Sequence, residues 1–521
     1  DIFIMFESLA KNKIVADKAF NRWMVPPAAL MIHLSIGMIY GFSIFWPELT
    51  KLVGRECGAD ISFFQRIFIT SCDWMRSDVV WTFAIAIVFL GLAAALFGHW
   101  LEKAGPRKAG VAAAIFWGGG LMVTSLGVSL HQLWLIWLGA GVIGGIGLGL
   151  GYISPVSTLI KWFPDRRGLA TGMAIMGFGG GAMIGMPLGD YLIKANGVGE
   201  TFFIMGLIYL FAMTIGAFGY RVPVEGWKPE GWKPVAKKTN NMISSSHVHV
   251  SVAHKTPQFW LLWGVLCLNV SAGIGVLSVA KPMFQEIAAS SFDPLIIGAI
   301  ATGFGALLSL ANIIGRIFWA SSSDFLGRKL TYAIFFSLGT ALYLAAPWAG
   351  INQYIATFVL ITLVILTMYG GGFATIPAYL ADIFGTQHVG AIHGRLLTAW
   401  SLAGIVGPML ISYLREYQLS MGIPTDQAYN SSFKILALLL IVGFILNLLV
   451  KPVDKKFGMT SEELKAEQGA LKIDHTSLKT VASVTNVSMQ RLLLPLAWIV
   501  VGVPITLGIL NALQKGIIIF L

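Results

Sequence analysis

The sequence predicts an all-α membrane protein built from two parallel six-helix repeats, with an additional hydrophobic helix near its C-terminus. Of its 521 residues, 56% are hydrophobic and 12% are charged, and the mean hydropathy is +0.75. A soluble globular protein of this length cannot bury so much apolar surface. Apolar runs of about 20 residues recur along the chain, and each is long enough to cross a bilayer. The two halves also align with each other at a constant shift.

The first half begins with a basic tail, which we assign to residues 1–23. It carries four cations ahead of the first apolar run: Lys11, Lys13, Lys18 and Arg22. Cationic loops stay in the cytoplasm, so we expect the N-terminus on that side, together with the basic turns at 102–108 and 161–167. The first six-helix half is expected at 24–221, with spans at 24–46, 80–97, 109–129, 133–159, 168–192 and 201–220.

A polar cytoplasmic linker, residues 222–256, separates the two halves. Its pair His247 and His249 could bind a metal, but the Ser-rich surroundings favour a solvated linker, and we expect no metal site. The second six-helix half is expected at 257–451, with spans at 258–282, 295–322, 330–348, 354–380, 389–414 and 433–450.

A second cytoplasmic segment, residues 452–490, leads to one more apolar run at 492–513. We assign residues 491–521 to a thirteenth hydrophobic helix, because the run is long enough to span. A re-entrant or surface-lying segment is the alternative.

The repeat rests on positions that recur 222 residues later in the chain. They include an acidic residue and a glycine in a charged turn, a proline in span four and a glycine in span five: Glu102 and Asp324, Gly105 and Gly327, Pro155 and Pro377, Gly185 and Gly407. Parallel duplicated halves are typical of transporters that rock about a site near the bilayer midplane.

The duplicated turns contain charges that can hold neighbouring helix ends together. An acidic side chain near a helix terminus and an Arg that reaches terminal carbonyls or carboxylates stabilise such ends. We expect these turns to form a gate on the cytoplasmic face, with four residues as its elements: Glu102, Arg107, Asp324 and Arg328.

Arg316 is the main candidate for a binding residue. It lies in the apolar run of span eight, eight residues before Asp324 in the charged turn. A helix rises about 1.5 Å per residue, so the Arg lies roughly 12 Å below the interface, near the bilayer midplane. A cation at that depth must meet an anion. The partner is either a carboxylate of the protein or the substrate, and few acidic residues lie at that depth.

Several motifs of the chain resemble known transporters. The stretch Gly98-x-x-x-Glu-Lys-x-Gly-x-Arg-Lys and its weaker copy from Ala320 resemble the loop motif of the major facilitator superfamily. Other stretches are similar to the oxalate/formate antiporter family: Lys161-Trp-Phe-Pro-Asp-Arg-Arg-Gly, the glycine-rich run 176–182, Asn312-x-x-Gly-Arg-x-Phe-Trp, His393-Gly-Arg-Leu-Leu-Thr-Ala-Trp, and the Trp-Lys-Pro linker. The resemblance covers about residues 24–450 and implies the major facilitator fold.

This resemblance implies roles for two positions. In the oxalate carrier of that family, an arginine in span eight and a lysine in span eleven hold the two carboxylates of the substrate. Arg316 matches the arginine, but Trp400 stands at the lysine position. Two buried anionic charges need two countercharges, so the departure favours a monocarboxylate over oxalate.

Aromatic residues at mid-span depth are the candidates for lining the cavity around this cation. By resemblance, they cage a small carboxylate; lipid-facing or interfacial rings are the alternative. The expected substrate-binding residues are Arg316, Trp400, Tyr40, Tyr152, Tyr369 and Phe373. His33 in span one is either a proton relay or a packed, neutral side chain.

Cys57 and Cys72 lie in the first loop on the side opposite the linker. Disulfides persist outside the cytoplasm, so we expect the two to pair, with two free thiols as the alternative.

We therefore expect a secondary active transporter of a small organic anion, with a monocarboxylate such as formate, pyruvate or lactate as substrate. It would work by alternating access, as an exchanger or a proton symporter. An oxalate or dicarboxylate exchanger and a non-transporting membrane sensor are the alternatives. We expect no enzyme activity and no cofactor, because no span shows a nucleophile–base pair or a metal-spaced cluster. We also expect a monomer in the bilayer of the bacterial inner membrane, without nucleic-acid partners.

Overall fold

The computed structural model describes most of the chain. The described residues are 8–17, 19–58, 60–163, 165, 167–224, 227–231, 247–385, 388–464, 466 and 487–521, without the side chains of 99, 102, 103, 160, 167–171 and 174. Twelve helices in these ranges are long and apolar enough to cross a membrane. A further 30-residue helix, α9 (Arg167–Asn196), packs among them. The prediction of an all-α membrane protein is confirmed.

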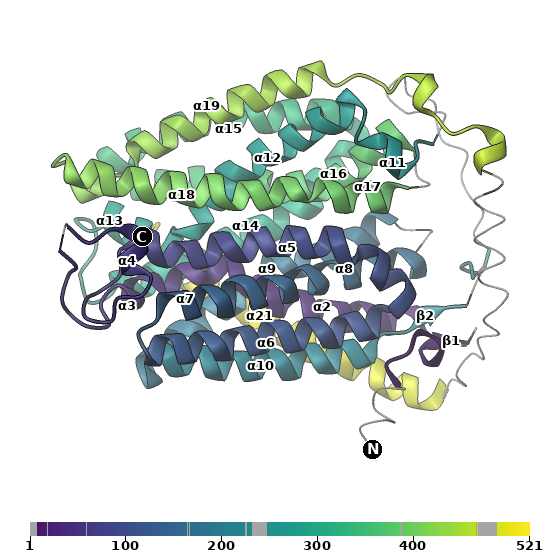
Figure 1. Ribbon diagram of the computed structural model, residues 1–521, viewed down its shortest axis with the longest axis horizontal. Helices are drawn as coiled ribbons and strands as arrows, with labels where there is room; N and C mark the ends of the chain where they lie inside the picture. Colours follow the sequence, from purple (N-terminus) through teal and green to yellow (C-terminus); the bar gives the residue numbers. More distant parts are fainter. Residues whose placement is uncertain are drawn as a thin grey trace.

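The helices of the first half form one bundle, purple to blue in Figure 1. Span one is the α-helix α2 (Val25–Ile36), which continues as the 3₁₀ helix η3 (Gly37–Ile44). The other members are α5 (Arg76–Ala104), α6 (Pro106–Ser129), α7 (Leu133–Ile136), the π-helical turn η4 (Trp137–Ile143), α8 (Gly144–Trp162), α9 and α10 (Val198–Gly219). Each lies close to its predicted span.

The helices of the second half form the other bundle, teal to green in Figure 1. They are α12 (Pro257–Ser278), α13 (Ala280–Ile287), α14 (Ile297–Leu326), α15 (Arg328–Ile351), α16 (Ile355–Phe384), α17 (Val389–Leu396), α18 (Thr398–Ser420) and α19 (Asn430–Leu449). Spans seven and eleven are each divided, at Val279 and Leu397. Trp400 therefore stands in the first turn of α18.

The duplicated turns have the same backbone in both halves. Gly105 joins α5 to α6 with a φ of +90°, and Gly327 joins α14 to α15 with a φ of +86°. A positive φ is disfavoured for residues that carry a Cβ, which explains the glycine at both turns. The end of the molecule that carries these two turns, on the right in Figure 1, is called the linker end below, and the opposite end the disulfide end.

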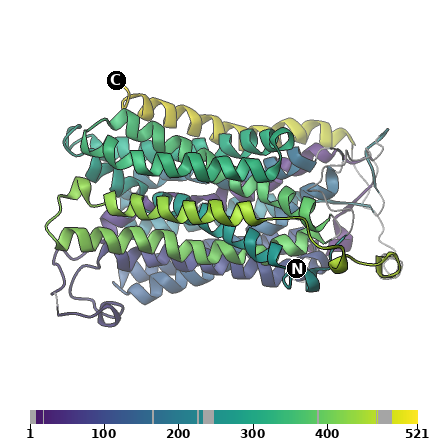
Figure 2. The same ribbon diagram turned by 90° about the horizontal axis from the view of Figure 1, so that it is seen from above.

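Two seams join the bundles. One is formed by α5 and α18, and the other by α9 and α14. The additional helix, α21 (Val487–Ile517), packs against α9 and α14 at the second seam and also contacts α2. Figure 2 shows it along one edge of the molecule. Gly508 and Gly516 allow close approach, to Met183 and Ile184 of α9 and to Leu307 of α14 respectively. α21 is thus one continuous helix in contact with both halves.

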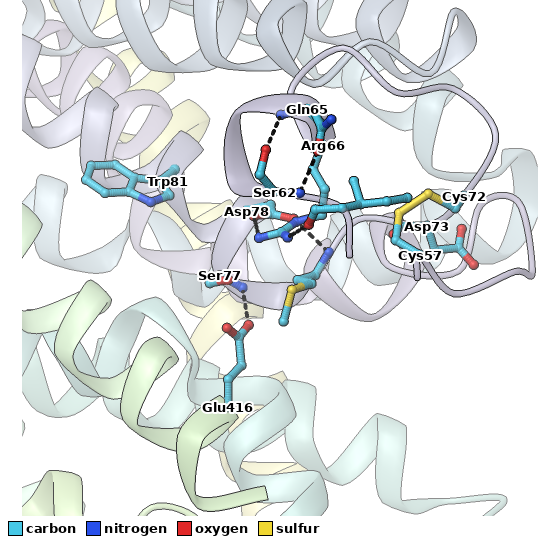
Figure 3. Close-up of polar contacts among 12 residues, drawn as sticks. Cys57, Ser62, Gln65, Arg66, Cys72, Asp73, Ser77, Asp78, Trp81 and Glu416 are labelled. Atoms are coloured by element: carbon cyan, nitrogen blue, oxygen red, sulfur yellow. Dashed lines mark hydrogen bonds and ion pairs between the residues drawn. A yellow bond between two sulfur atoms is a disulfide. The ribbon is translucent and has the colours of Figure 1, made fainter. Parts of the chain in front are cut away.

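The linker end ties the N-terminal tail to the linker. Strand β1 (Val15–Ala16) pairs in parallel with β2 (Val222–Pro223), and Ile14 packs with Val15 and Val222. At the disulfide end, the first loop contains the short helix α4 (Phe63–Arg66). Figure 3 shows this loop, with a disulfide between Cys57 and Cys72 and with Arg66 beside Asp78.

The disulfide should stabilise the loop against unfolding. It links residues separated by 15 positions, and the chain-entropy model gives about 3 kcal/mol for a loop of this size. We expect the double variant Cys57→Ser/Cys72→Ser to lower the thermal midpoint of the purified protein in detergent. Peptide mapping without reductant should find both cysteines protected; two alkylatable thiols in the native protein would contradict the assignment.

Candidate functional site

The site is built around Arg316, which the structure buries completely in α14. Its Nε donates a hydrogen bond to Oδ1 of Asn312, at 2.9 Å, one helical turn earlier. Its Nη1 and Nη2 have no hydrogen-bond partner and no ion-pair partner among the described residues. The hydroxyl of Tyr40 lies near the guanidinium but outside hydrogen-bonding geometry. Within the described chain, the internal ion pair considered from the sequence is therefore absent.

Two acidic residues with little exposure, Asp190 and Glu286, pair with other cations. Asp190 binds Nζ of Lys281 at 2.7 Å. Glu286 binds Arg76 and Arg415, at 2.7 and 2.6 Å. These contacts lie near the disulfide end and leave the charge of Arg316 uncompensated.

Six aromatic side chains surround this cation, and we call them the aromatic cage: Tyr40, Tyr152, Phe178, Tyr369, Phe373 and Trp400. Each is no more than 2% exposed, so the cage is closed to solvent. The guanidinium carbon of Arg316 lies 5.4 Å from the ring centre of Phe373. Phe373 in turn lies 4.5 Å from Trp400, and the Tyr369 hydroxyl donates to the Tyr40 hydroxyl at 2.7 Å.

The cage is assembled from both halves. Tyr40 comes from η3, Tyr152 from α8 and Phe178 from α9, whereas α16 and α18 supply the other three rings. The five aromatic residues predicted from the sequence thus meet around the predicted cation. The sequence analysis did not identify Phe178. Its ring centre lies 4.9, 5.6 and 5.4 Å from the ring centres of Tyr40, Tyr152 and Trp400. The only signal in the sequence was its place inside the glycine-rich run.

The glycines of that run allow α9 to approach the site. A Cβ on Gly179 would lie 2.9 Å from Nε of Arg316, and a Cβ on Gly37 would lie 2.2 Å from the carbonyl oxygen of Phe178. Side chains at these positions would push the backbone of α9 away from span one and from α14. The run is therefore a packing device that positions Phe178 against the cage.

The unsatisfied polar atoms around the cage are able to donate hydrogen bonds. Besides Nη1 and Nη2 of Arg316, they are Nε1 of Trp400, Nδ2 of Asn312 and the hydroxyl of Tyr152. Buried donors without acceptors are unfavourable, because each has lost its hydration. A ligand that carries negatively charged oxygens would satisfy several of them at once.

Ion pairs close the disulfide end between the two halves. Arg76 of α5 contacts two residues of the second half, Glu286 at 2.7 Å and the Tyr429 hydroxyl at 3.0 Å. We call Arg76, Glu286, Arg415 and Tyr429 the latch. At the other seam, Asp190 of α9 binds Lys281 of α13. Figure 3 shows a further link near the latch, from the backbone N–H of Ser77 to Glu416, at 2.9 Å.

The latch keeps its charges over a wide pH range. Burial would raise the pKa of Glu286, but the guanidiniums of Arg76 and Arg415 outweigh it and hold this pKa below its ordinary value. A depressed pKa means that the stabilisation is complete above about pH 4.5 and is lost only as the pH falls through the lower folded-state value.

The halves also pack directly against each other where α5 crosses α18, beside the cage. The Ser401 hydroxyl of α18 donates to the carbonyl oxygen of Val88 in α5, at 2.9 Å. Gly91 makes this approach possible, because a Cβ there would lie 2.8 Å from the carbonyl oxygen of Leu397. The two halves are therefore in contact both at the latch and along α5 and α18 beside the cage.

The arginines expected to form the cytoplasmic gate contact helix ends and carboxylates of their own halves. Arg107 donates to the carbonyl oxygens of Ser8, Phe218 and Tyr220, all in the first half. Arg328 contacts Ser323, Asp324 and Asp382, all in the second half. The side chain of Glu102 lies outside the described residues. The described contacts hold each half together rather than joining the two.

His33 lies beside the cage rather than among its donors. Its ring stacks on that of Tyr152 at 5.5 Å, and its Nε2 is 3.1 Å from the Tyr152 carbonyl oxygen. Two other cations that could have served as a second charge also lie elsewhere. Lys281 is paired with Asp190, and Arg395 donates to the Val250 carbonyl oxygen at 2.9 Å.

Comparison with known proteins agrees with this architecture. The Major Facilitator Superfamily model matches residues 20–308 and 271–516. The oxalate:formate antiporter of Oxalobacter formigenes is 27% identical over 453 residues, covering 85% of this chain and 96% of that protein. The apicoplast pyruvate carrier 1 of Toxoplasma gondii is 25% identical over 441 residues, covering 73% and 76%.

Among solved structures, a bacterial homologue of the human lysosomal transporter Spinster, inward-facing and unoccupied, has a TM-score of 0.58 at 13% identity. The match covers 84% of this chain and 98% of that one, and it shows the fold alone.

Loss of Arg76 should open the disulfide end. Arg76→Gln removes the cation that crosses between the halves, while Arg415 still compensates Glu286. We expect the distance between spin labels at Lys51→Cys and Ala289→Cys, one on each half, to lengthen or broaden in double electron–electron resonance, with Cys267 replaced by Ser.

Lys194→Gln is the matched control, since Lys194 pairs with Asp190 on its own helix, at 2.8 Å. Its distance distribution should equal that of the wild type. An unchanged distribution in Arg76→Gln would show that the latch does not hold the halves together.

Proposed function

We propose that this chain, which belongs to the major facilitator superfamily, is a secondary carrier of a small monocarboxylate such as formate, pyruvate or lactate. Membership of the superfamily makes it a multi-pass membrane transporter of small solutes rather than an enzyme. The names of the two relatives, an oxalate:formate antiporter and a pyruvate carrier, support a small carboxylate as the substrate class.

The proposal rests on Arg316, whose Nη1 and Nη2 are buried without an acceptor among the described residues. A guanidinium presents two parallel N–H donors to a carboxylate, and this pairing is strong where water is excluded. The surrounding rings exclude water, and the hydroxyl and indole donors offer additional contacts. A single carboxylate would neutralise the one uncompensated charge of the cage.

The count of charges favours a monocarboxylate over oxalate. Trp400 places an apolar ring where a second cation would be needed, and Lys281 and Arg395 are engaged elsewhere. A dicarboxylate in this cage would bury one carboxylate without a partner, at a cost of several kcal/mol. His33, stacked against Tyr152, is the candidate relay if transport is coupled to protons, and both exchange and proton symport remain compatible with the cage.

Alternating access requires the contacts between the halves to break in turn on the two sides of the cage. We propose that the halves rock about the cage, so that the latch opens in one state and the contact of Ser401 with Val88 opens in the other. The basic tail and linker assign the linker end to the cytoplasm, which puts the disulfide on the outer side of a bacterial inner membrane. We propose a monomer as the working unit.

Arg316→Gln should abolish carboxylate transport in proteoliposomes, because the carboxylate loses its only counter-charge. Arg316→Lys should rescue it only in part, since an ammonium cannot make the planar two-pronged contact. The assay is uptake of labelled formate, pyruvate and lactate, and the folded state is checked by gel filtration. Wild-type uptake by Arg316→Gln would place the site elsewhere.

Trp400→Lys should change the preference of the carrier between one and two carboxylates. The new ammonium supplies a second charge, so monocarboxylate transport should weaken and oxalate should begin to compete. The measurement compares oxalate with formate and lactate as competitors of uptake in both proteins. Oxalate that competes equally well in the wild type would refute the one-cation proposal.

A further inference from the structure

We propose that Asn312 is a positioning residue: its neutral amide holds the guanidinium of Arg316 in place while leaving the positive charge free for the substrate. The second part of this inference rests on the proposed function, whereas the first concerns the protein without any ligand. Asn312 is completely buried, and its Nδ2 is one of the unsatisfied donors around the cage.

The geometry assigns the amide its orientation. Asn312 and Arg316 are four residues apart on α14 and therefore face the same side of the helix. Nε of Arg316 is a donor only, and it lies 2.9 Å from the Asn312 side chain. The amide must therefore present its oxygen to Nε, because the opposite orientation would bring two donors together. Its Nδ2 is left without a partner and adds to the donors around the cage.

Two glycines on other helices confine this pair. A Cβ on Gly370 of α16 would lie 2.5 Å from Oδ1 of Asn312. A Cβ on Gly179 of α9 would lie 2.9 Å from Nε of Arg316 and 3.3 Å from Cγ of Asn312. The amide and the guanidinium thus lie between two bare stretches of backbone, which leaves little room for the guanidinium to turn. Only its two Nη groups remain available.

The neutrality of Asn312 is what distinguishes it from the usual partner of a buried arginine. An aspartate has almost the same shape and could accept the same hydrogen bond, but it would also neutralise the guanidinium. In the rest of the described site no carboxylate does this; the titratable groups near the guanidinium are the phenols of Tyr40, Tyr152 and Tyr369, and His33 stacks on Tyr152. An amide gives orientation without competing for the substrate.

Asn312→Asp should therefore change stability and binding in opposite directions. Without ligand, the variant should be more stable than the wild type, because it pairs a buried charge that has no partner; we expect a rise in thermal midpoint of about 2 °C or more. If Asn312 were only a packing residue, the variant would be less stable, because a buried carboxylate without a counter-charge lowers stability. Asn269→Asp is the matched control, as Asn269 is buried in α12, and this variant should lose stability.

The background of Arg316→Gln completes a double-mutant cycle on the protein without ligand. There, adding Asn312→Asp should lower the thermal midpoint, because the carboxylate becomes the unpaired group. Asn312→Ala in the wild type should also lower it, because Nε loses its acceptor. If Asn312→Asp destabilises the wild type as much as it destabilises Arg316→Gln, the charge of Arg316 is already compensated and the inference is wrong.

The binding arm uses formate, pyruvate and lactate as probes, with the KM for uptake and the ligand-induced thermal shift as readouts. Asn312→Asp should raise the KM about tenfold or more, and Asn312→Ala should raise it less, because a free guanidinium can still reach the carboxylate. Wild-type KM in Asn312→Asp would overturn the inference. If the wild type binds none of the three acids, the proposed function fails, while the stability cycle still decides the role of Asn312.

Discussion

A guanidinium without a counter-charge, enclosed by aromatic rings, is the interaction on which the rest of this structure depends. Elsewhere in the described chain, several acidic residues of low exposure are paired with cations, as in Asp190 with Lys281 and Glu286 with Arg415. At Arg316 the pairing stops at one neutral amide. In a site of low effective dielectric, such a charge attracts an anion far more strongly than it would in water, so the cost of keeping it unpaired is recovered when a carboxylate enters.

Excluding water from this guanidinium requires close backbone packing. This requirement explains the glycines and the interrupted helices around it. Span one becomes a 3₁₀ helix at Gly37, where it meets the carbonyl of Phe178, and span eleven is divided just before Trp400. Both halves contribute rings, and the Tyr40–Tyr369 hydrogen bond crosses between them. Opening either end must therefore disturb the cage itself, which couples the state of the site to the positions of the halves.

The sequence predicted the span order, the duplicated turn and six residues that meet in the fold, Arg316 and five of the rings around it, because these depend on local patterns. The length of each hydrophobic run identifies a span, and a glycine beside charged residues identifies each turn. An Arg at midplane depth is recognisable because a buried cation needs a partner. The latch could not be predicted, because Arg76 and Glu286 meet only when helices 210 residues apart pack together. Arg107 and Arg328 were expected to reach neighbouring helix ends as gate elements, and their described partners lie on helices of their own halves.

Phe178 and Asn312 show a different limit. A phenylalanine among glycines and an asparagine in an apolar run look like ordinary packing until the fold shows which atoms lie beside them. The contact of Gly179 with Arg316 and the bond from Nε to Asn312 are properties of three helices together. Sequence patterns locate the charge, but its availability to a ligand depends on what the surrounding helices leave unpaired.

The most direct test of the account is an experimental structure of the protein with its carboxylate bound, using whichever of formate, pyruvate or lactate competes best. The account predicts carboxylate density inside the aromatic cage, with its oxygens about 3 Å from Nη1 and Nη2 of Arg316. Density for the acid at another position, with the guanidinium of Arg316 paired to a protein carboxylate, would contradict it.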